Sequence, residues 1–156
     1  MPKTFSLQVF SEIKAAPVAF LKKNIPDARE MLECVLQQFI IVCVGDRRMR
    51  QLHKQFMNLD STTDVLTFPL EFDKKQNVVG GEVYVCIPQA RRQARKRGIA
   101  VSHEVLLYAI HGMLHLSGFD DRTKADYLNM HNMEDRILTS LGFGKIFSAR
   151  QAGGKA

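Results

Sequence analysis

Hydrophobic and polar positions alternate or cluster along the chain in a way that predicts four short strands. Residues 4–10 alternate between polar and apolar side chains, as expected for a strand with one buried face. Residues 39–44 form a continuous apolar run of strand length that ends at Gly45. Pro69 indicates that its strand ends there or lies at the edge of a sheet. The predicted strands are residues 4–10, 39–44, 65–69 and 82–86.

Helical spacing of apolar residues, together with start and stop signals, predicts helices over much of the remaining chain. Pro26 precedes the first of them, and Asp46 is expected to cap the second. Pro88 suits the first turn of the third helix, which Gly98 ends. The predicted helices span residues 28–38, about 47–58, 88–98, 102–118 and about 123–141.

The order of these elements predicts an α+β fold, with a small mixed sheet of about four strands packed with helices. Residues 1–147 are expected to form a single domain, because no linker separates two cores and the chain shows no repeat. Residues 72–79 are polar and are expected to form a mobile loop. Residues 148–156 bury little and are expected to form a disordered tail.

Composition excludes several classes of protein. Hydrophobic residues make up 46% of the chain, too many for a disordered protein. The three cysteines, Cys34, Cys43 and Cys86, are widely spaced, which favours small buried side chains over a disulfide framework. No signal peptide or membrane-spanning run is found, so we expect a cytoplasmic location.

The formal net charge of +6 favours an acidic partner, with nucleic acid first among the candidates. Arg91, Arg92 and Arg95 belong to the densest basic cluster, and Arg50 and Lys54 lie on the predicted helix before the third strand. These residues are candidates for RNA contact, and a solvated helix face is the alternative.

Two histidines four residues apart carry the clearest chemical signal in the sequence. His111 and His115 lie in the long apolar helix. Positions i and i+4 are about 40° apart around a helix and ~6 Å apart along it, so both imidazoles can bind one metal ion. Gly118 can then end the helix and turn the chain back, which brings Asp120 or Asp121 toward the same ion.

Zinc is the metal that suits such a site, because it prefers imidazole and carboxylate ligands. We expect one zinc ion per chain, bound by three protein ligands, with water at the fourth position. His131 competes with Asp121 for the third place, since the following helix could bring it near the ion. His103 and His131 are otherwise expected at the surface or between helices.

Several familiar catalytic signatures are missing from the chain. In zinc peptidases of the HExxH type a glutamate follows the first histidine and acts as the base, whereas this chain has Gly112 there. There is also no GxSxG elbow, no GxxxxGK[ST] loop and no GxGxxG loop. The sequence therefore argues against a peptidase of that type.

Residues 111–121, His-Gly-Met-Leu-His-Leu-Ser-Gly-Phe-Asp-Asp, resemble the HGxLHLxGYDH signature of the YbeY family of metal-dependent endoribonucleases. Residues 63–69, Thr-Asp-Val-Leu-Thr-Phe-Pro, are similar to that family's TDVLSFP strand. Residues 81–83 stand where the family has GDI. The last helix also matches, through Met130, Glu134, Ile137, Leu138, Leu141 and Gly142. The likeness extends from about residue 40 to residue 142.

The resemblance implies a zinc-dependent, single-strand-specific endoribonuclease of ribosomal RNA processing, maturation and small-subunit quality control in the cytoplasm. It implies a catalytic α+β domain whose metal-binding helix lies in a cleft beside a basic RNA groove. His111, His115 and Asp121 would be the metal ligands, and zinc-bound water the nucleophile or base, with no protein general base assigned. The expected partners are single-stranded ribosomal RNA and the small ribosomal subunit, and neither a membrane nor DNA is expected.

The chain departs from the family pattern at four positions. The third histidine is replaced by Asp121, which remains a good zinc ligand. An arginine that could stabilise charge on a phosphate is replaced by Met57. The other two departures are His53 in place of an asparagine and Glu82 in place of an aspartate.

Two alternative functions stay open on the sequence. One is a non-enzymatic RNA-binding factor of ribosome assembly in which the zinc is structural, an alternative that the loss of the arginine at Met57 keeps open. The other is a metallohydrolase that acts on a peptide or a small phosphate ester. Cleavage of peptides but not of RNA would favour the metallohydrolase. Binding of RNA or small subunits without metal-dependent cleavage would favour the assembly factor.

Overall fold

The computed structural model describes residues 4–144. Four strands form one mixed sheet in the order β1-β2-β4-β3. β2 pairs in parallel with both β1 and β4, whereas β3 is antiparallel to β4 and lies at an edge. The elements are β1 (Ser6–Ser11), α1 (Val18–Leu32), β2 (Gln38–Val44), α2 (Asp46–Met57), β3 (Val65–Phe72), β4 (Val78–Cys86), α3 (Ile87–Arg97), α4 (Val101–Leu116) and α5 (Lys124–Ser140). The predicted α+β class is confirmed.

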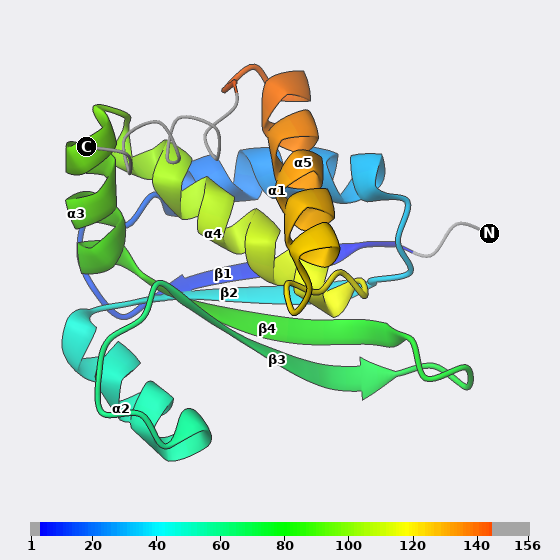
Figure 1. Ribbon diagram of the computed structural model, residues 1–156, viewed down its shortest axis with the longest axis horizontal. Helices are drawn as coiled ribbons and strands as arrows, with labels where there is room; N and C mark the ends of the chain where they lie inside the picture. The colour runs from blue at the N-terminus through cyan, green and yellow to red at the C-terminus, as the bar shows by residue number, and fades with distance from the viewer. Residues whose placement is uncertain (1–3, 145–156) are drawn as a thin grey trace.

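Helices cover the two faces of the sheet unequally: α1, α4 and α5 lie on one side and α2 on the other (Figure 1). The larger core fills the space between the sheet and the three helices. The smaller core joins Met49 and Leu52 of α2 to Val42, Val44 and Leu66 of the sheet. α4 is the central helix, because it packs on the sheet as well as on α1, α3 and α5. A helix in that position must be apolar on nearly every side, which explains its sequence.

The first helix differs most from its prediction, residues 28–38. α1 begins ten residues earlier, at Val18, and ends at Leu32, and Pro26 lies inside it. An interior proline costs a helix about 3 kcal/mol. Leu21 and Ile25, which precede the proline in the helix, are fully buried. Burial of each such side chain stabilises the fold by about 1.5–3 kcal/mol. Packing on the sheet therefore outweighs the proline, and the predicted boundaries were wrong.

The loop predicted at residues 72–79 is shorter in the structure, because β3 extends to Phe72 and β4 begins at Val78, so a turn at residues 73–77 joins them; its mobility stays a prediction. The carboxylate of Asp73 accepts hydrogen bonds from the backbone N–H groups of Lys75 and Asn77, both at 2.9 Å. The backbone N–H of Asp73 donates to the carbonyl oxygen of Asn77 at 2.9 Å. These bonds close the turn locally. The edge position expected from Pro69 is confirmed.

Asp46 does not cap α2, contrary to the prediction. Gly45 occupies the capping position, and Asp46 is the first residue of the helix. Its carboxylate instead receives two hydrogen bonds from Arg92 of α3, at 2.8 and 3.0 Å. These hydrogen bonds, which outweigh partial burial, lower the pKa of Asp46 to about 2. The pair therefore ties α2 to α3.

The remaining helix ends follow their local signals. Gly98 ends α3 with φ of 65°, and Gly118 follows α4 with φ of 101°. The hydroxyl of Thr123 accepts the N–H of Asp126 at 3.0 Å and caps α5. Cys43 and Cys86 are buried as expected, Cys34 is half-buried, and all three cysteines are free thiols.

Among the described residues no single helix is long and apolar enough to cross a membrane, although α3 and α4, which are bent by 118° relative to each other, reach the required length and composition together. The predicted tail at residues 148–156 lies outside the described residues, and the predicted domain end at residue 147 does so too.

Candidate metal centre

Glycines let α4 lie unusually close to the sheet and so position its histidines. A Cβ atom on Gly112 would lie 2.5 Å from Cγ1 of Val83 and 3.1 Å from Oγ1 of Thr67. Real side chains do not approach that closely, so only glycine fits between the helix and β4. This packing gives the physical reason for the missing glutamate: the peptidase base has no room at position 112.

His111 and His115 are the two side chains of α4 between Glu104 and Leu116 that are not buried. Their Nε2 atoms lie 3.2 Å apart. Two nitrogen ligands at 2.0–2.1 Å from a tetrahedral zinc ion are separated by about 3.3 Å, so the pair fits one ion. Partial burial, and then the neighbouring His111, lower the pKa of His115 and favour its neutral, metal-binding form.

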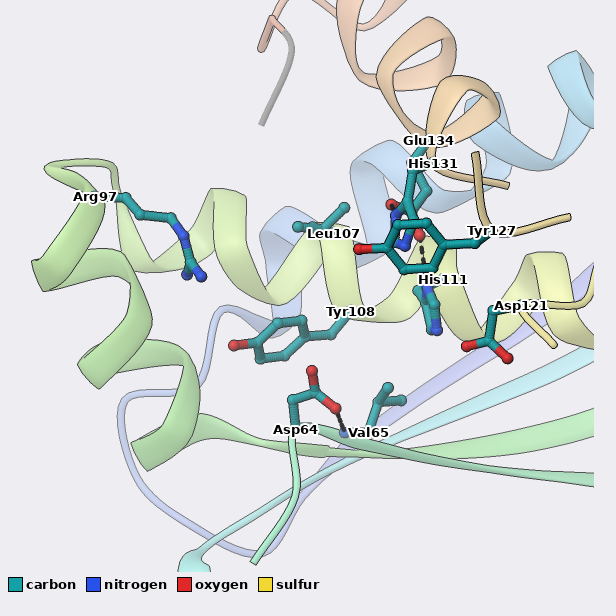
Figure 2. Close-up of a pocket in the computed structure, with 10 residues that line it drawn as sticks. All are labelled: Asp64, Val65, Arg97, Leu107, Tyr108, His111, Asp121, Tyr127, His131 and Glu134. Carbon is teal, nitrogen blue, oxygen red and sulfur yellow. Dashed lines mark hydrogen bonds and ion pairs between the residues drawn. The ribbon is translucent and has the colours of Figure 1, made fainter. Parts of the chain in front are cut away.

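Glu134 of α5 orients His111 from behind (Figure 2). Its Oε1 lies 2.6 Å from Nδ1 of His111, and its Oε2 lies 2.7 Å from Nδ1 of His131. The carboxylate is completely buried. Burial opposes its ionisation, but the hydrogen bonds from the two histidines outweigh burial and hold the pKa of Glu134 below its ordinary value. With Nδ1 of His111 donating to Glu134, Nε2 is left available to bind a metal ion.

The sequence pattern did not predict this role of Glu134, which it gives only as part of the likeness in the last helix. His131, expected at the surface or between helices, is buried at 5% exposure. The spacing His131-x-x-Glu134 places both side chains on one face of α5, and that was the available signal.

Asp121 lies on the loop that follows Gly118, as the sequence suggested. Its Oδ2 is 3.9 Å from Nε2 of His115. Ligand atoms of His111, His115 and Asp121 all lie within 4.8 Å of one another. Asp120 is engaged elsewhere, because its Oδ2 is 3.2 Å from Nε of Arg122. The structure therefore brings together the three residues that the sequence singled out.

A second group, His111, His131 and Glu134, also has ligand atoms that all lie within 4.8 Å of one another. It differs from the first in burial, because His131 and Glu134 are enclosed between α4 and α5 while Asp121 is exposed. In the second group, Nδ1 of His111 and Nδ1 of His131 already form hydrogen bonds with the carboxylate of Glu134.

Two depressions meet at the histidines. The Tyr108 arm, which includes Tyr108, Tyr127 and His131, has a volume of about 420 Å³ (Figure 2). The Met57 arm, which runs from Met57 to His115, has a volume of about 610 Å³. Both are lined by Asp64, Val65, His111 and Asp121, so they form one continuous groove.

The five basic candidates for RNA contact fall on two different helices. Arg50 and Lys54 line a separate depression of about 390 Å³ on α2. Arg91, Arg92 and Arg95 are exposed on α3, and none of the three lines either arm of the groove. Arg92 is already bound to Asp46.

Comparison with known proteins agrees with this geometry. The profile of the family described as "Endoribonuclease YbeY" matches residues 10–142. The curated protein of that name from Thermus thermophilus is 32% identical over 124 residues, which cover 73% of this chain and 88% of that protein. The Anaeromyxobacter protein of that name is 36% identical over 116 residues, which cover 74% of this chain and 59% of that protein.

A solved structure shows the same fold. The solution structure of TM1509 from Thermotoga maritima matches with a TM-score of 0.58 and 25% identity, over 86% of this chain and 91% of that one. The extent of the family match and the identity to the Thermus thermophilus protein place this chain in the YbeY family of endoribonucleases, which are hydrolytic nucleases acting on RNA.

Proposed function

We propose that this protein is a zinc-dependent endoribonuclease that cuts single-stranded RNA, with His111, His115 and Asp121 as the metal ligands. The observation that carries the proposal is the 3.2 Å separation of the two Nε2 atoms at the junction of the two arms. One zinc ion per chain fits there, because nitrogen and carboxylate ligands suit zinc and three protein ligands leave a position open.

Asp121 is a better third ligand than His131. Nδ1 of His131 faces Glu134 at 2.7 Å, and both residues are buried. A metal in that group would have to displace the hydrogen bonds that join Glu134 to the two histidines. Asp121 borders both arms of the groove, so a metal bound with it is reachable by substrate.

When bound, zinc activates water and polarises the phosphoryl oxygen of the scissile phosphodiester. The protein's own residues prepare that chemistry. Glu134 fixes the ring of His111 and the nitrogen that it presents, because it accepts the hydrogen bond from Nδ1. His131 holds the second oxygen of Glu134 and thereby fixes the carboxylate. Asp121 adds a negative charge that favours binding of a cation.

The geometry disfavours a purely structural zinc site and a peptidase of the HExxH type. Structural zinc sites are closed by four protein ligands, whereas this group of three borders an open groove. A peptidase of the HExxH type needs a glutamate where Gly112 packs against Val83. The open groove beside the histidines therefore supports catalysis on an extended strand.

We place the activity in ribosomal RNA processing and maturation and in quality control of the small subunit, in the cytoplasm. The family resemblance motivates the ribosomal role, and the net charge of +6 favours a nucleic-acid partner. A reducing compartment fits the three free thiols. Co-sedimentation with purified small subunits tests the partner, and no retention in that fraction would contradict it.

Metal analysis paired with RNA cleavage tests the enzymatic proposal. Purified protein should hold about one zinc ion per chain and cut single-stranded RNA, and a chelator should stop cleavage. His111→Ala and His115→Ala should lose metal and activity together. His53→Ala is the matched control, because His53 lies on α2 and binds the carbonyl of Ser61 at 2.9 Å. Full metal content in both site variants would contradict the proposal.

A further inference from the structure

The Met57 arm differs in character from a phosphate-binding groove. The apolar residues that line it are Met57, Val65, Leu66, Pro69, Val78 and Leu116. Met57 is 58% exposed at the end of α2, so an apolar side chain stands at the mouth of the arm in contact with water. Exposed apolar surface next to a catalytic site indicates a ligand with an apolar face.

The charged residues that line the Met57 arm argue against a phosphate group as its occupant. Its charged lining residues are three acids, Asp64, Asp120 and Asp121, and one base, Arg122. Arg122 is compensated, since its Nε lies 3.2 Å from Oδ2 of Asp120. Without a metal ion, a phosphate in this arm would meet net negative charge, whereas a neutral planar group would not.

β3 supplies a further feature that suits such a group. Residues 65–67 and Pro69 line the arm, and β3 is the outer strand of the sheet. Among the described strands, β3 pairs with β4 alone, so its other edge presents backbone donors and acceptors. Groups of that kind can hydrogen-bond the edge of a nucleobase.

α2 connects the arm to positive charge. Arg50 and Lys54 are four residues apart, and Met57 follows three residues later, so all three lie along one side of the helix. Arg50 and Lys54 line the depression on α2, and Met57 lines the arm. An RNA strand whose phosphates contact the basic side of α2 would therefore place one of its bases next to the Met57 arm.

We propose that the Met57 arm is a subsite for one unpaired nucleobase of the RNA, which packs against Met57 and the outer edge of β3. The inference rests on RNA as the substrate and deepens the proposed function, but it does not require the metal. A paired base cannot enter, because its edge and faces are engaged in the duplex. The arm thus supplies a physical reason for a single-stranded substrate.

Binding of a labelled single-stranded oligoribonucleotide to the full chain in chelator tests this subsite without cleavage. Met57→Ser should weaken binding about tenfold, because an apolar contact with the base is lost, and should leave the salt dependence unchanged, because no charge is removed. Leu59→Ser is the matched control: Leu59 is 50% exposed and lies outside the residues that line the arm. Met57→Leu should retain most of the affinity.

A second probe locates the base itself. Oligoribonucleotides that carry a single abasic site at successive positions should bind the unaltered protein weakly at one position and normally elsewhere. With Met57→Ser that positional loss should disappear, because the contact is already gone. Equal losses for Met57→Ser and Leu59→Ser, or indifference to every abasic position, would overturn the subsite. Base recognition without metal-dependent cleavage would leave the subsite standing and contradict the proposed catalysis instead.

Discussion

Oε1 of Glu134 lies 2.6 Å from Nδ1 of His111, so a completely buried carboxylate on α5 fixes the ring orientation of a half-buried histidine on α4. The pair joins two helices, and its two residues are 23 positions apart in the sequence. Because the carboxylate accepts the proton on Nδ1, the opposite nitrogen of the ring faces the groove with its lone pair.

Glu134→Gln should lower zinc affinity about 10–100-fold, since the amide accepts a weaker hydrogen bond from His111 than the carboxylate does. Competition with a chelator of known affinity measures the change. Asp135→Asn is the matched control, because Asp135 is a buried carboxylate on the same helix. Equal affinity for zinc in Glu134→Gln and unaltered protein would mean that Glu134 only joins the helices.

Asp121→Ala should weaken zinc binding without unfolding the domain, since Asp121 lies on an exposed loop. Asp121→His should keep the metal, because imidazole replaces a carboxylate as a ligand. His131→Ala is the comparison that decides between the two candidate groups. Loss of metal in His131→Ala together with full retention in Asp121→Ala would show that the third ligand is His131 of α5.

Gly112→Ala should destabilise the fold by about 1–3 kcal/mol, because the added Cβ would lie 2.5 Å from Cγ1 of Val83. Urea unfolding measures the change in the free energy of unfolding. Val83→Ala removes the obstructing methyl groups, so Gly112→Ala should cost less in that background than alone. Additive losses in the double variant would show that helix and sheet do not compete for this space.

Asp46→Asn should make the free energy of unfolding depend less on pH in the acid range. In the folded chain the pKa of Asp46 is about 2, against an ordinary value of 3.8. The unfolded chain therefore takes up the proton first, and the contribution of Asp46 is present above pH 4 and lost as the pH falls toward 2. Both side chains are more than two-fifths exposed, so the effect should stay below about 1 kcal/mol. Urea unfolding between pH 2 and 6 measures it, and parallel curves for both proteins would contradict it.

Met57→Arg should raise the cleavage rate, by up to about 100-fold, because the planar guanidinium can still pack on the base in the arm while its charge stabilises the adjoining phosphate beside the histidines. The slope of the logarithm of the RNA-binding constant against the logarithm of the salt concentration should also become steeper by about one. Gln51→Arg adds the same charge on the α2 depression and should change the salt dependence without the gain in rate. Equal rates in all three proteins would show that no charge is missing at position 57.

Much of the site could be predicted because it depends on local rules. The spacing of His111 and His115 fixes their convergence within one helix, and Gly118 turns the chain back toward them. Thr123 caps the next helix through its own neighbours. Each of these relationships spans only a few residues, so periodicity and capping preferences are enough to find it.

The relationships that the sequence did not reveal depend on packing between distant segments. Glu134 reaches His111 only because α5 packs on α4, and Asp46 meets Arg92 across 46 residues. Pro26 led to the wrong bounds for the first helix for the same reason, since its local cost is outweighed by burial against a sheet formed elsewhere in the chain. Such partners compete with local preferences, and a sequence pattern does not show which of the two prevails.

The junction of the two arms at His111 has a consequence for turnover. If the RNA strand occupies both arms, a cut beside the histidine pair would leave its two fragments in different arms, each with only part of the contacts of the intact strand. Each product would then bind more weakly than the substrate. The arrangement of the two arms would therefore favour product release and weak product inhibition.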